Sequence, residues 1–148
     1  MTDWLHKVQY YETDQMQIVH HANSIKWFEE ARMHLLDEID FGYDKMEEAG
    51  LLVPVLSVSA QYRSMTRFGE TVAISAKIKE LTGVKLILSY EITDQETGKL
   101  RCTGESKHTF LDAETYCTVS LEKKNKDIYD LFKKCMTHKK IEKCVVIH

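Results

Sequence analysis

The spacing of apolar residues changes along the chain, from the period of a helix to the period of a strand. In residues 24–39, apolar side chains recur at intervals of three and four, which predicts a long amphipathic helix. Asn23 or Ser24 is expected to cap its start, and Gly42 to adopt a left-handed conformation just past its end. A shorter helix is expected over Tyr43–Ala49. The apolar stripe of the long helix consists of Ile25, Phe28, Ala31, Leu35, Leu36 and Ile39.

Elsewhere apolar and polar residues alternate with a period of two, which predicts half-buried strands. Short turns such as Thr82-Gly83 indicate antiparallel hairpins, whose sheet is apolar on one face. Strands are expected over residues 4–11, 53–63, 70–80, 84–92 and 100–111. The side chains expected to face the core are Leu56, Val58, Ala60, Tyr62, Val72, Ile74, Ala76, Ile78, Val84, Leu86, Leu88, Tyr90 and Ile92.

A sheet with one apolar face must be covered, and the helix over residues 24–39 is long enough to cover it. The sequence therefore predicts an α+β fold in which a long central helix packs on a five-stranded antiparallel sheet, with a short terminal helix over residues 127–136. We expect one domain over residues 1–136 and a C-terminal tail over residues 137–148. The unpaired edges of a small open sheet favour pairing with a second copy of the chain.

The composition is that of an ordinary globular protein and narrows the classes of function. The 148 residues are 43% hydrophobic and 29% charged, and a net charge of −3 does not favour binding to nucleic acid. We expect neither a membrane-spanning helix nor an export signal, because no apolar stretch is long enough. The four cysteines are widely spaced and form no CxxC pair, which predicts reduced thiols and a cytoplasmic location.

Asp14 and His21 flank the segment that leads into the long helix, which makes them candidates for catalysis. The first turn of a helix presents free backbone N–H groups and a partial positive charge, so a carbonyl oxygen held there is polarised. A carboxylate in the preceding loop can attack that carbonyl or deprotonate a water molecule. Spacing alone leaves another interpretation open, in which Asp14 is a loop or capping aspartate and His20 and His21 are ordinary loop histidines.

Three runs of residues around this segment carry a resemblance to a known family. They are Tyr10-Tyr11-Glu12-Thr13-Asp14, Ile18-Val19-His20-His21-Ala22-Asn23 and Trp27-Phe28-Glu29-Glu30-Ala31-Arg32. Together they resemble the signature of the hotdog-fold acyl-CoA thioesterases, in particular the branch that contains 4-hydroxybenzoyl-CoA thioesterase and the YbgC thioesterases. Beyond residue 117 the resemblance fades.

The resemblance implies a function and a role for each matching residue. The chain is expected to hydrolyse an acyl-CoA thioester without a metal or other cofactor, with coenzyme A as part of the substrate. Asp14 corresponds to the catalytic carboxylate, acting as nucleophile or general base. The thioester oxygen is expected at the backbone N–H groups of His21 and Ala22, where the His21 imidazole can assist. The family also implies homodimers or homotetramers with active sites at the dimer interface.

Two positions depart from the family pattern, and two arginines are candidates for binding coenzyme A. Gln17 stands in a turn where the family usually has glycine, and Ser24 stands where it usually has an aromatic residue. Both departures bear on which acyl group is accepted. Arg63 and Arg67 flank a predicted strand end and are expected to bind the phosphates of coenzyme A, with solvated or ion-paired arginines as the alternative.

Two other classes of function compete with hydrolysis by a carboxylate. A non-catalytic module that binds acyl-CoA on the same fold is the alternative that Gln17 and Ser24 favour, and release of free thiol distinguishes the two. A metal hydrolase that uses His20, His21 and His34 is disfavoured, because the sequence contains no HExxH motif and adjacent histidines rarely converge on one ion.

Overall fold

The computed structural model describes the backbone of residues 2–147 and the side chains of residues 2–136. The residues group into two compact units. The first unit comprises the chain up to Leu35 with Val58–Ala76 and Ser89–Glu105, and the second comprises Leu36–Ser57, Lys77–Leu88 and the chain from Ser106 onward. All the residues that the sequence predicts for catalysis or for binding coenzyme A belong to the first unit.

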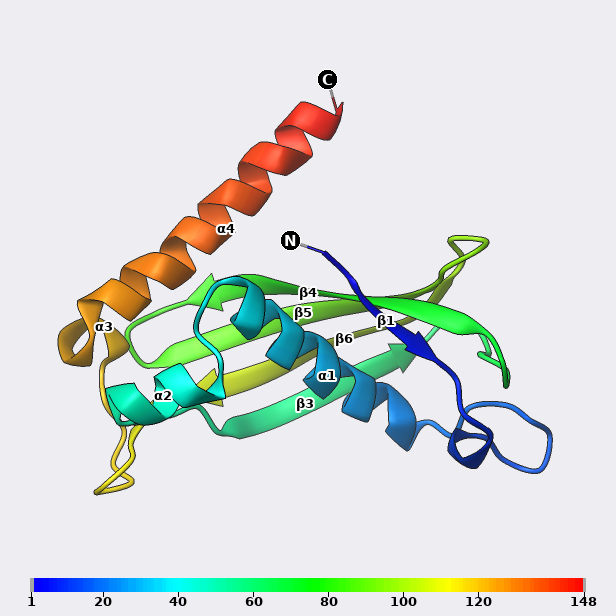
Figure 1. The fold of residues 1–148 in the computed structure, drawn as a ribbon, viewed down its shortest axis with the longest axis horizontal. Coiled ribbons are helices and arrows are strands. Elements are labelled where there is room, and N and C mark those ends of the chain that lie inside the picture. The colour runs from blue at the N-terminus through cyan, green and yellow to red at the C-terminus, as the bar shows by residue number, and fades with distance from the viewer. Residues whose placement is uncertain (1, 148) are drawn as a thin grey trace. The chain divides into compact units, whose positions relative to one another are not determined.

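Five strands form the main sheet in the order β1-β4-β5-β6-β3 (Figure 1). The sheet is antiparallel, and β1 pairs with β4 so that Trp4 lies opposite Ile74. A separate two-stranded sheet joins β2 and β7. The strands are β1 (Trp4–Lys7), β2 (Leu51–Leu52), β3 (Val55–Tyr62), β4 (Thr71–Leu81), β5 (Lys85–Asp94), β6 (Leu100–Thr109) and β7 (Leu111–Asp112).

The helices complete a mixed fold and confirm the predicted α+β class. They are the 3₁₀ helix η1 (Tyr10–Glu12), α1 (Ala22–Glu38), α2 (Tyr43–Ala49), α3 (Leu121–Lys124) and α4 (Lys126–Ile147). The short helix α2 has the predicted bounds and ends at Gly50, whose φ of 66° is a left-handed value. The sequence did not predict α3, and the strand expected over residues 4–11 ends at Lys7 and is followed by η1. Helix α4 begins one residue before its predicted start and continues to Ile147, so it is not the short helix that was expected to end at residue 136.

In the first unit, α1 lies along one face of the sheet (Figure 1), and its aromatic side chains Trp27 and Phe28 are buried. The Phe28 ring is 1% exposed and stacks on Tyr90 of β5, with 4.6 Å between the ring centroids. A Cβ atom at Gly104 of β6 would lie 2.5 Å from both Phe28 Cε2 and the Ser59 carbonyl oxygen. Only glycine therefore allows α1 and β3 to approach β6 this closely.

In the second unit, polar contacts hold α3 and an aromatic contact holds the first half of α4. Phe41 meets Phe132 edge to face, with 5.5 Å between the ring centroids. The Leu121 N–H donates to the Gly83 carbonyl oxygen at 2.6 Å, and the Lys124 ammonium lies 2.6 Å from an Asp112 carboxylate oxygen. The predicted tail over residues 137–148 lies outside the described side chains, so the division of the chain at residue 136 stays a prediction.

The end of α1 corrects the prediction for Gly42, whose φ of −70° is not left-handed. Asp40 takes the left-handed conformation instead, with φ at 59°. The Phe41 N–H then donates to the Leu36 carbonyl oxygen at 2.8 Å, and the Asp40 N–H donates to Asp37 at 3.1 Å. This bonding closes the helix two residues earlier than the glycine suggests, and it buries Phe41.

Three predictions about the core are also wrong. Val84, expected to face the core, lies just before β5 and is 49% exposed. Ile25, placed in the apolar stripe of α1, is 39% exposed. On β3, Leu56 is 63% exposed, and Val58 and Tyr62 are exposed as well, although all three were expected to face the core. The strand lies at the edge of the sheet, so these side chains lack the cover that the buried rows of β4 and β5 receive.

No helix in the described part of the chain combines the length and the apolar character that a membrane crossing requires.

Candidate active site

Two adjacent loops of the first unit carry most of the candidate residues, and backbone hydrogen bonds join them. We call them the Asp14 loop (residues 13–19) and the Arg67 loop (residues 63–69). A β-bridge between Thr13 and Val19 closes the Asp14 loop, and a second bridge pairs Ile18 with Arg67. The Val19 N–H also donates to the Thr66 carbonyl oxygen at 2.8 Å. The structure therefore brings Asp14 and Arg67 into one local assembly.

The Asp14 carboxylate is exposed and is oriented through one of its two oxygens. Its Oδ1 accepts the N–H of Met16 at 2.8 Å and the N–H of Ile18 at 3.3 Å. The backbone N–H of Asp14 donates to the Ile18 carbonyl oxygen at 2.9 Å, which closes the turn. Within the described part of the chain, Asp14 Oδ2 accepts no hydrogen bond. One oxygen holds the carboxylate in place while the other stays available for chemistry.

Gln17 lies in the turn of the Asp14 loop, and its φ of 63° is left-handed. A residue with a Cβ atom pays a steric penalty of about 1–2 kcal/mol in this conformation, whereas glycine does not. The turn thus needs the backbone conformation for which glycine is usual, although this chain has glutamine there.

The start of α1 differs from the predicted cap. The helix begins at Ala22, whose N–H donates to the His20 side chain at Nδ1 over 3.3 Å. Neither Asn23 nor Ser24 caps it, because the Asn23 side chain donates to the Glu12 carbonyl oxygen at 2.8 Å and Ser24 is buried against the Cys102 thiol. Sequence reasoning missed His20 as the capping group, since histidine is not a usual N-cap residue.

His21 immediately precedes α1, and it is exposed. Its backbone N–H finds no acceptor among the described residues, whereas the Ala22 N–H makes only the long bond to His20. The Tyr62 hydroxyl of β3 donates to the His21 carbonyl oxygen at 2.7 Å. The predicted pair of N–H groups is present at the helix start, and one of the two is free.

Glu12 is a buried residue of the site that the sequence analysis did not single out. It is 5% exposed and accepts hydrogen bonds from His6 Nε2, the Gln9 N–H and Trp27 Nε1, each at 2.8 Å. Burial raises the pKa of Glu12, but the hydrogen bonds from His6, Gln9 and Trp27 outweigh it and hold the pKa below its usual value. No periodic signal marks it, because it lies in a polar run between two elements.

Arg63 and Arg67 present guanidinium groups on the exposed side of the Arg67 loop. Arg63 Nη2 donates to Gln61 Oε1 at 2.6 Å, and neither arginine forms an ion pair with a residue that the structure describes. Arg101 differs from these two arginines, because its Nη2 lies 2.8 Å from Glu70 Oε2 in a partly buried ion pair. Within the described part of the chain, the Arg67 loop thus carries two cations without acidic partners, and one of them, Arg67, is paired with the Asp14 loop through Ile18.

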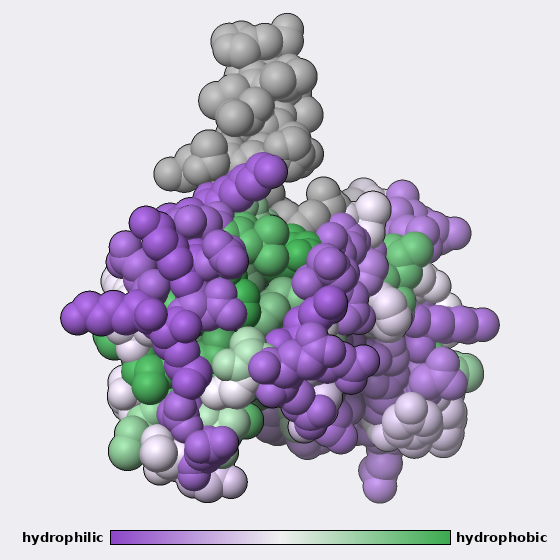
Figure 2. Space-filling view, turned by 60° about the vertical axis from the view of Figure 1, so that its left-hand side comes forward, coloured by the Kyte–Doolittle hydropathy of each residue, from purple (hydrophilic) through white to green (hydrophobic). Residues whose placement is uncertain are grey.

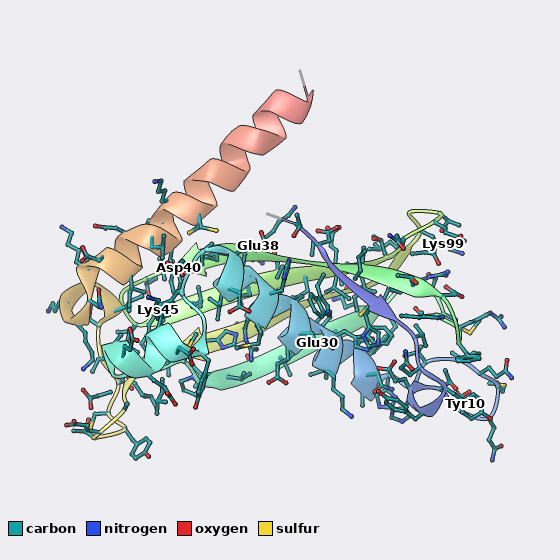
Figure 3. All side chains as sticks on the ribbon, viewed as in Figure 1. Tyr10, Glu30, Glu38, Asp40, Lys45 and Lys99 are labelled. Atoms are coloured by element: carbon teal, nitrogen blue, oxygen red, sulfur yellow. The ribbon has the colours of Figure 1, made fainter. Side chains whose placement is uncertain are left out.

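Exposed apolar side chains surround the same two loops. The Tyr10 ring of η1 meets the Phe68 ring edge to face, with 5.6 Å between the ring centroids, and Figure 3 labels Tyr10 at η1. Tyr11 is 83% exposed. Apolar side chains beside free cations suit a ligand that has both an apolar and an anionic part. The exposed set consists of Tyr10, Tyr11, Met16, Met65 and Phe68.

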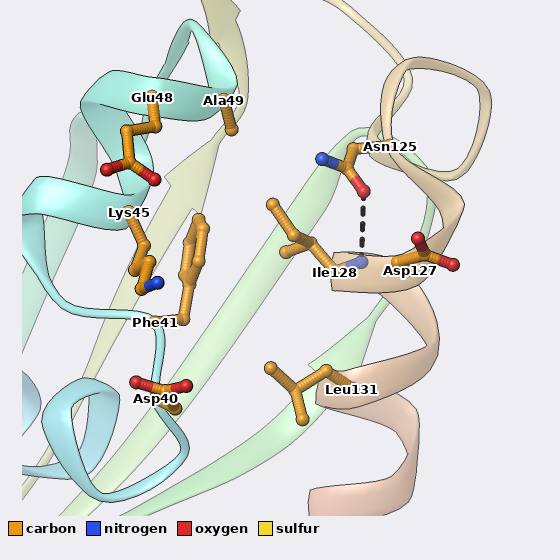
Figure 4. A pocket seen from close by; sticks show the side chains of 9 residues that line it. All are labelled: Asp40, Phe41, Lys45, Glu48, Ala49, Asn125, Asp127, Ile128 and Leu131. Carbon is orange, nitrogen blue, oxygen red and sulfur yellow. Dashed lines mark hydrogen bonds between the residues drawn. The ribbon is translucent and has the colours of Figure 1, made fainter.

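The second unit contains a separate pocket of about 360 Å³. Apolar surface shows between polar residues on the side of the molecule that carries α2 and α3 (Figure 2). Within the pocket, Asn125 Oδ1 accepts the Ile128 N–H at 3.2 Å (Figure 4). None of the predicted site residues lines it, and no group of three metal-ligating side chains occurs among the described residues. The lining residues are Asp40, Phe41, Lys45, Glu48, Ala49, Asn125, Asp127, Ile128 and Leu131.

Comparison with known proteins gives consistent matches over most of the chain. The model of the thioesterase-like superfamily matches residues 8–134. The putative acyl-CoA thioesterase YneP of Bacillus subtilis is 33% identical over 128 residues, which cover 86% of this chain and 92% of YneP. The acyl-CoA thioesterase YbgC of Helicobacter pylori is 28% identical over 131 residues, covering 82% and 95%.

Solved structures agree with this match. A DHNA-CoA thioesterase from Staphylococcus aureus superposes with a TM-score of 0.85 at 24% identity, covering 95% of this chain and 94% of that one. The resemblance and the fold that the sequence predicts are thereby confirmed.

The left-handed conformation at position 17 predicts that Gln17→Gly stabilises the protein. Relief of about 1–2 kcal/mol of steric strain exceeds the entropy that glycine adds to the unfolded chain, so we expect the free energy of unfolding to rise by about 0.5–1 kcal/mol. Urea denaturation measures this change. The matched control is Gln15→Gly at an exposed position whose φ is not positive, which should lower stability. Equal losses in both variants would show that position 17 carries no strain.

Proposed function

Because the chain belongs to the thioesterase-like superfamily, we propose that it hydrolyses an acyl-CoA thioester to a free acid and coenzyme A. The observation that carries this proposal is the geometry of Asp14. One carboxylate oxygen is bound by its own loop and the other is free, and the loop leads directly into the start of α1. A carboxylate and a set of amide dipoles suffice for an activated ester, so the proposed reaction uses no metal or other cofactor.

In the proposed reaction the thioester carbonyl oxygen lies at the start of α1. The N–H of His21 is available there, and the Ala22 N–H can exchange its long bond to His20 for the substrate oxygen. Each such donor stabilises the developing oxyanion by about 3–4 kcal/mol. The His21 imidazole, exposed beside them, is a further proposed contributor.

Asp14 Oδ2 acts in one of two ways. As a nucleophile it attacks the carbonyl carbon and expels the thiolate of coenzyme A, and water then cleaves the mixed anhydride to regenerate the carboxylate. As a general base it takes a proton from a water molecule, whose oxygen attacks the same carbon. Both routes consume one water and give the acid and the free thiol.

We further propose that Arg63 and Arg67 bind the phosphates of coenzyme A. Neither guanidinium has an acidic partner in the described part of the chain, and Arg67 is joined to the Asp14 loop through Ile18. The exposed apolar side chains on these loops then contact the acyl or pantetheine part of the substrate.

The edge strand β3 supports assembly of two copies as the working form, with homotetramers as a further step. It lies at the end of the sheet and exposes Leu56 and Val58 beside unpaired backbone groups. Pairing this strand with the same strand of a second copy would satisfy those groups by two-fold symmetry. Tyr62 of β3 contacts His21, so such an interface would border the proposed site.

A cytoplasmic location is part of the same proposal. Cys102, Cys117 and Cys135 are free thiols, which suits a reducing compartment.

A non-catalytic acyl-CoA-binding module is the second candidate. The observation in its favour is that Asp14 Oδ1 already accepts two loop N–H groups, as it would in a purely structural turn. Such a module would bind the ester and release no thiol.

Asp14→Asn tests the proposed reaction, because asparagine keeps an oxygen for the N–H groups of Met16 and Ile18 and loses only the charge. We expect an unchanged melting temperature and a fall in turnover of roughly 10²–10⁴-fold. Thiol release from short-chain, long-chain and aromatic CoA esters is the measurement. His21→Ala should cost less, since it keeps the backbone N–H. Near-full turnover in Asp14→Asn would rule out the role of the carboxylate, and ester binding without thiol release by the unmodified protein would favour the binding module.

Arg63→Gln and Arg67→Gln test the binding of phosphates. Each should raise KM for an acyl-CoA by about three- to tenfold and leave kcat nearly unchanged, because a charge-assisted contact to substrate is lost. The same variants should behave like the unmodified protein toward an acyl-pantetheine ester, which lacks the nucleotide. Arg32→Gln, which breaks a 3.9 Å ion pair with Glu29, is the control. Equal effects on both substrates would contradict the assignment.

A charge on the sheet edge tests the proposed dimer. Val58→Lys on β3 should shift the sedimentation coefficient from dimer to monomer and reduce turnover, because it places a cation in the paired edge. Leu5→Lys on β1, the opposite edge, is the matched control and should leave the mass unchanged. A monomeric unmodified protein with full turnover would refute this part of the proposal.

A further inference from the structure

We propose that Glu12 is a positioning residue for the proposed reaction, which holds the Asp14 loop in register with the start of α1. This inference rests on the proposed function for its catalytic consequence, but the holding role itself follows from contacts of the residue. Glu12 does not touch the reacting atoms in this scheme. It acts through the two segments that carry them.

The side chain of Glu12 joins three elements of the first unit. Its Oε1 accepts His6 Nε2 from β1 and the Gln9 N–H that precedes η1, and its Oε2 accepts Trp27 Nε1 from α1, each at 2.8 Å. The carboxylate is buried, so these three donors replace the water that it loses on folding. The bond to Trp27 fixes the position of η1 along the axis of α1, at its second turn.

The backbone of Glu12 makes a second set of contacts, at the other end of the same segment. Its carbonyl oxygen accepts the His20 N–H at 2.9 Å and the Asn23 side-chain amide at 2.8 Å. His20 is the residue that caps α1, and Asn23 lies in its first turn. One residue therefore binds both the body and the beginning of the helix.

These contacts hold Glu12 directly before the first residue of the Asp14 loop, Thr13. The bridge between Thr13 and Val19 follows immediately, so one arm of the loop leads from Glu12 to Asp14 and the other returns to His20 and His21. A displacement of Glu12 therefore moves the Asp14 carboxylate relative to the N–H groups of His21 and Ala22. An error of about 1 Å between reacting groups can reduce a rate by roughly 100-fold.

A carboxylate is needed at this position because three donors converge on two oxygens. Glutamine has one acceptor oxygen and an NH₂ group, so at least one of the donors from His6, Gln9 and Trp27 would face another donor in a buried place. The other ring nitrogen of His6 lies 3.5 Å from Glu30 Oε2, and Figure 3 places Glu30 on α1. His6 thus joins β1 to α1 through both acidic residues.

Glu12→Gln is the test, and it has a readout that does not depend on activity. We expect amide hydrogen exchange over residues 13–23 to quicken by roughly tenfold or more, while exchange in β5 stays unchanged. For thiol release from an acyl-CoA, we expect kcat to fall by roughly 10–100-fold and KM to change less than about twofold. His6→Leu removes one donor from a partly exposed position, so it should give a smaller effect of the same kind even if Glu12→Gln does not fold.

Ile74→Val is the control, because it shortens a buried side chain of β4 that is not part of these contacts. It should lower the melting temperature and leave both kcat and the exchange of residues 13–23 unchanged. If Glu12→Gln and His6→Leu behave like Ile74→Val, Glu12 is only a structural residue and the proposal fails. If the unmodified protein releases no thiol from any ester, the proposed function fails, and the exchange measurement alone decides whether Glu12 holds the loop.

Discussion

The close approach of α1 to the sheet is the contact on which the rest of the first unit depends. Phe28 stacks on Tyr90 directly above Gly104, where a single added carbon would collide with both the ring and the neighbouring strand. Burial of these two aromatic rings is among the largest hydrophobic contributions that single side chains make to a fold. The depth at which α1 lies sets the position of its first turn, and therefore the position of the backbone N–H groups of His21 and Ala22.

The site is an arrangement of backbone as much as of side chains. Two N–H groups of the Asp14 loop orient the Asp14 carboxylate. His20 and Tyr62 bind the backbone at the start of α1, and the pairing of Ile18 with Arg67 joins the two loops. Such a site is rigid only if the buried groups behind it are satisfied, because an orphaned donor would draw the loop out of place. Glu12 satisfies that condition with its side chain and its carbonyl oxygen together.

The sequence predicted the architecture well, because periodicity reports burial on a continuous face. The long helix, the short helix with its end at Gly50, and the inward rows of β4 and most of β5 follow from spacing alone. It failed on β3, since alternation cannot distinguish a strand inside a sheet from one at the edge. It also placed the end of α1 at Gly42, although Asp40 adopts the left-handed conformation.

For the candidate site, the resemblance pointed to Asp14 and His21, whereas spacing alone left both open, and their roles stay predictions. Neither the cap by His20 nor the burial of Glu12 was predictable, since each depends on partners distant in sequence or on an unusual residue type. Only the structure shows which arginines form ion pairs. Arg101 pairs with Glu70, whereas Arg63 and Arg67 have no acidic partner among the described residues.

The hydroxyl of Tyr62 has a consequence for how this fold can change. It lies on the edge strand β3, yet it donates to the carbonyl oxygen of His21, the residue just before α1. This hydrogen bond joins the edge of the sheet to the N-terminus of α1. A substitution that moved the Tyr62 end of β3 would therefore also move the His21 carbonyl group, so changes at this sheet edge and at the start of α1 are coupled.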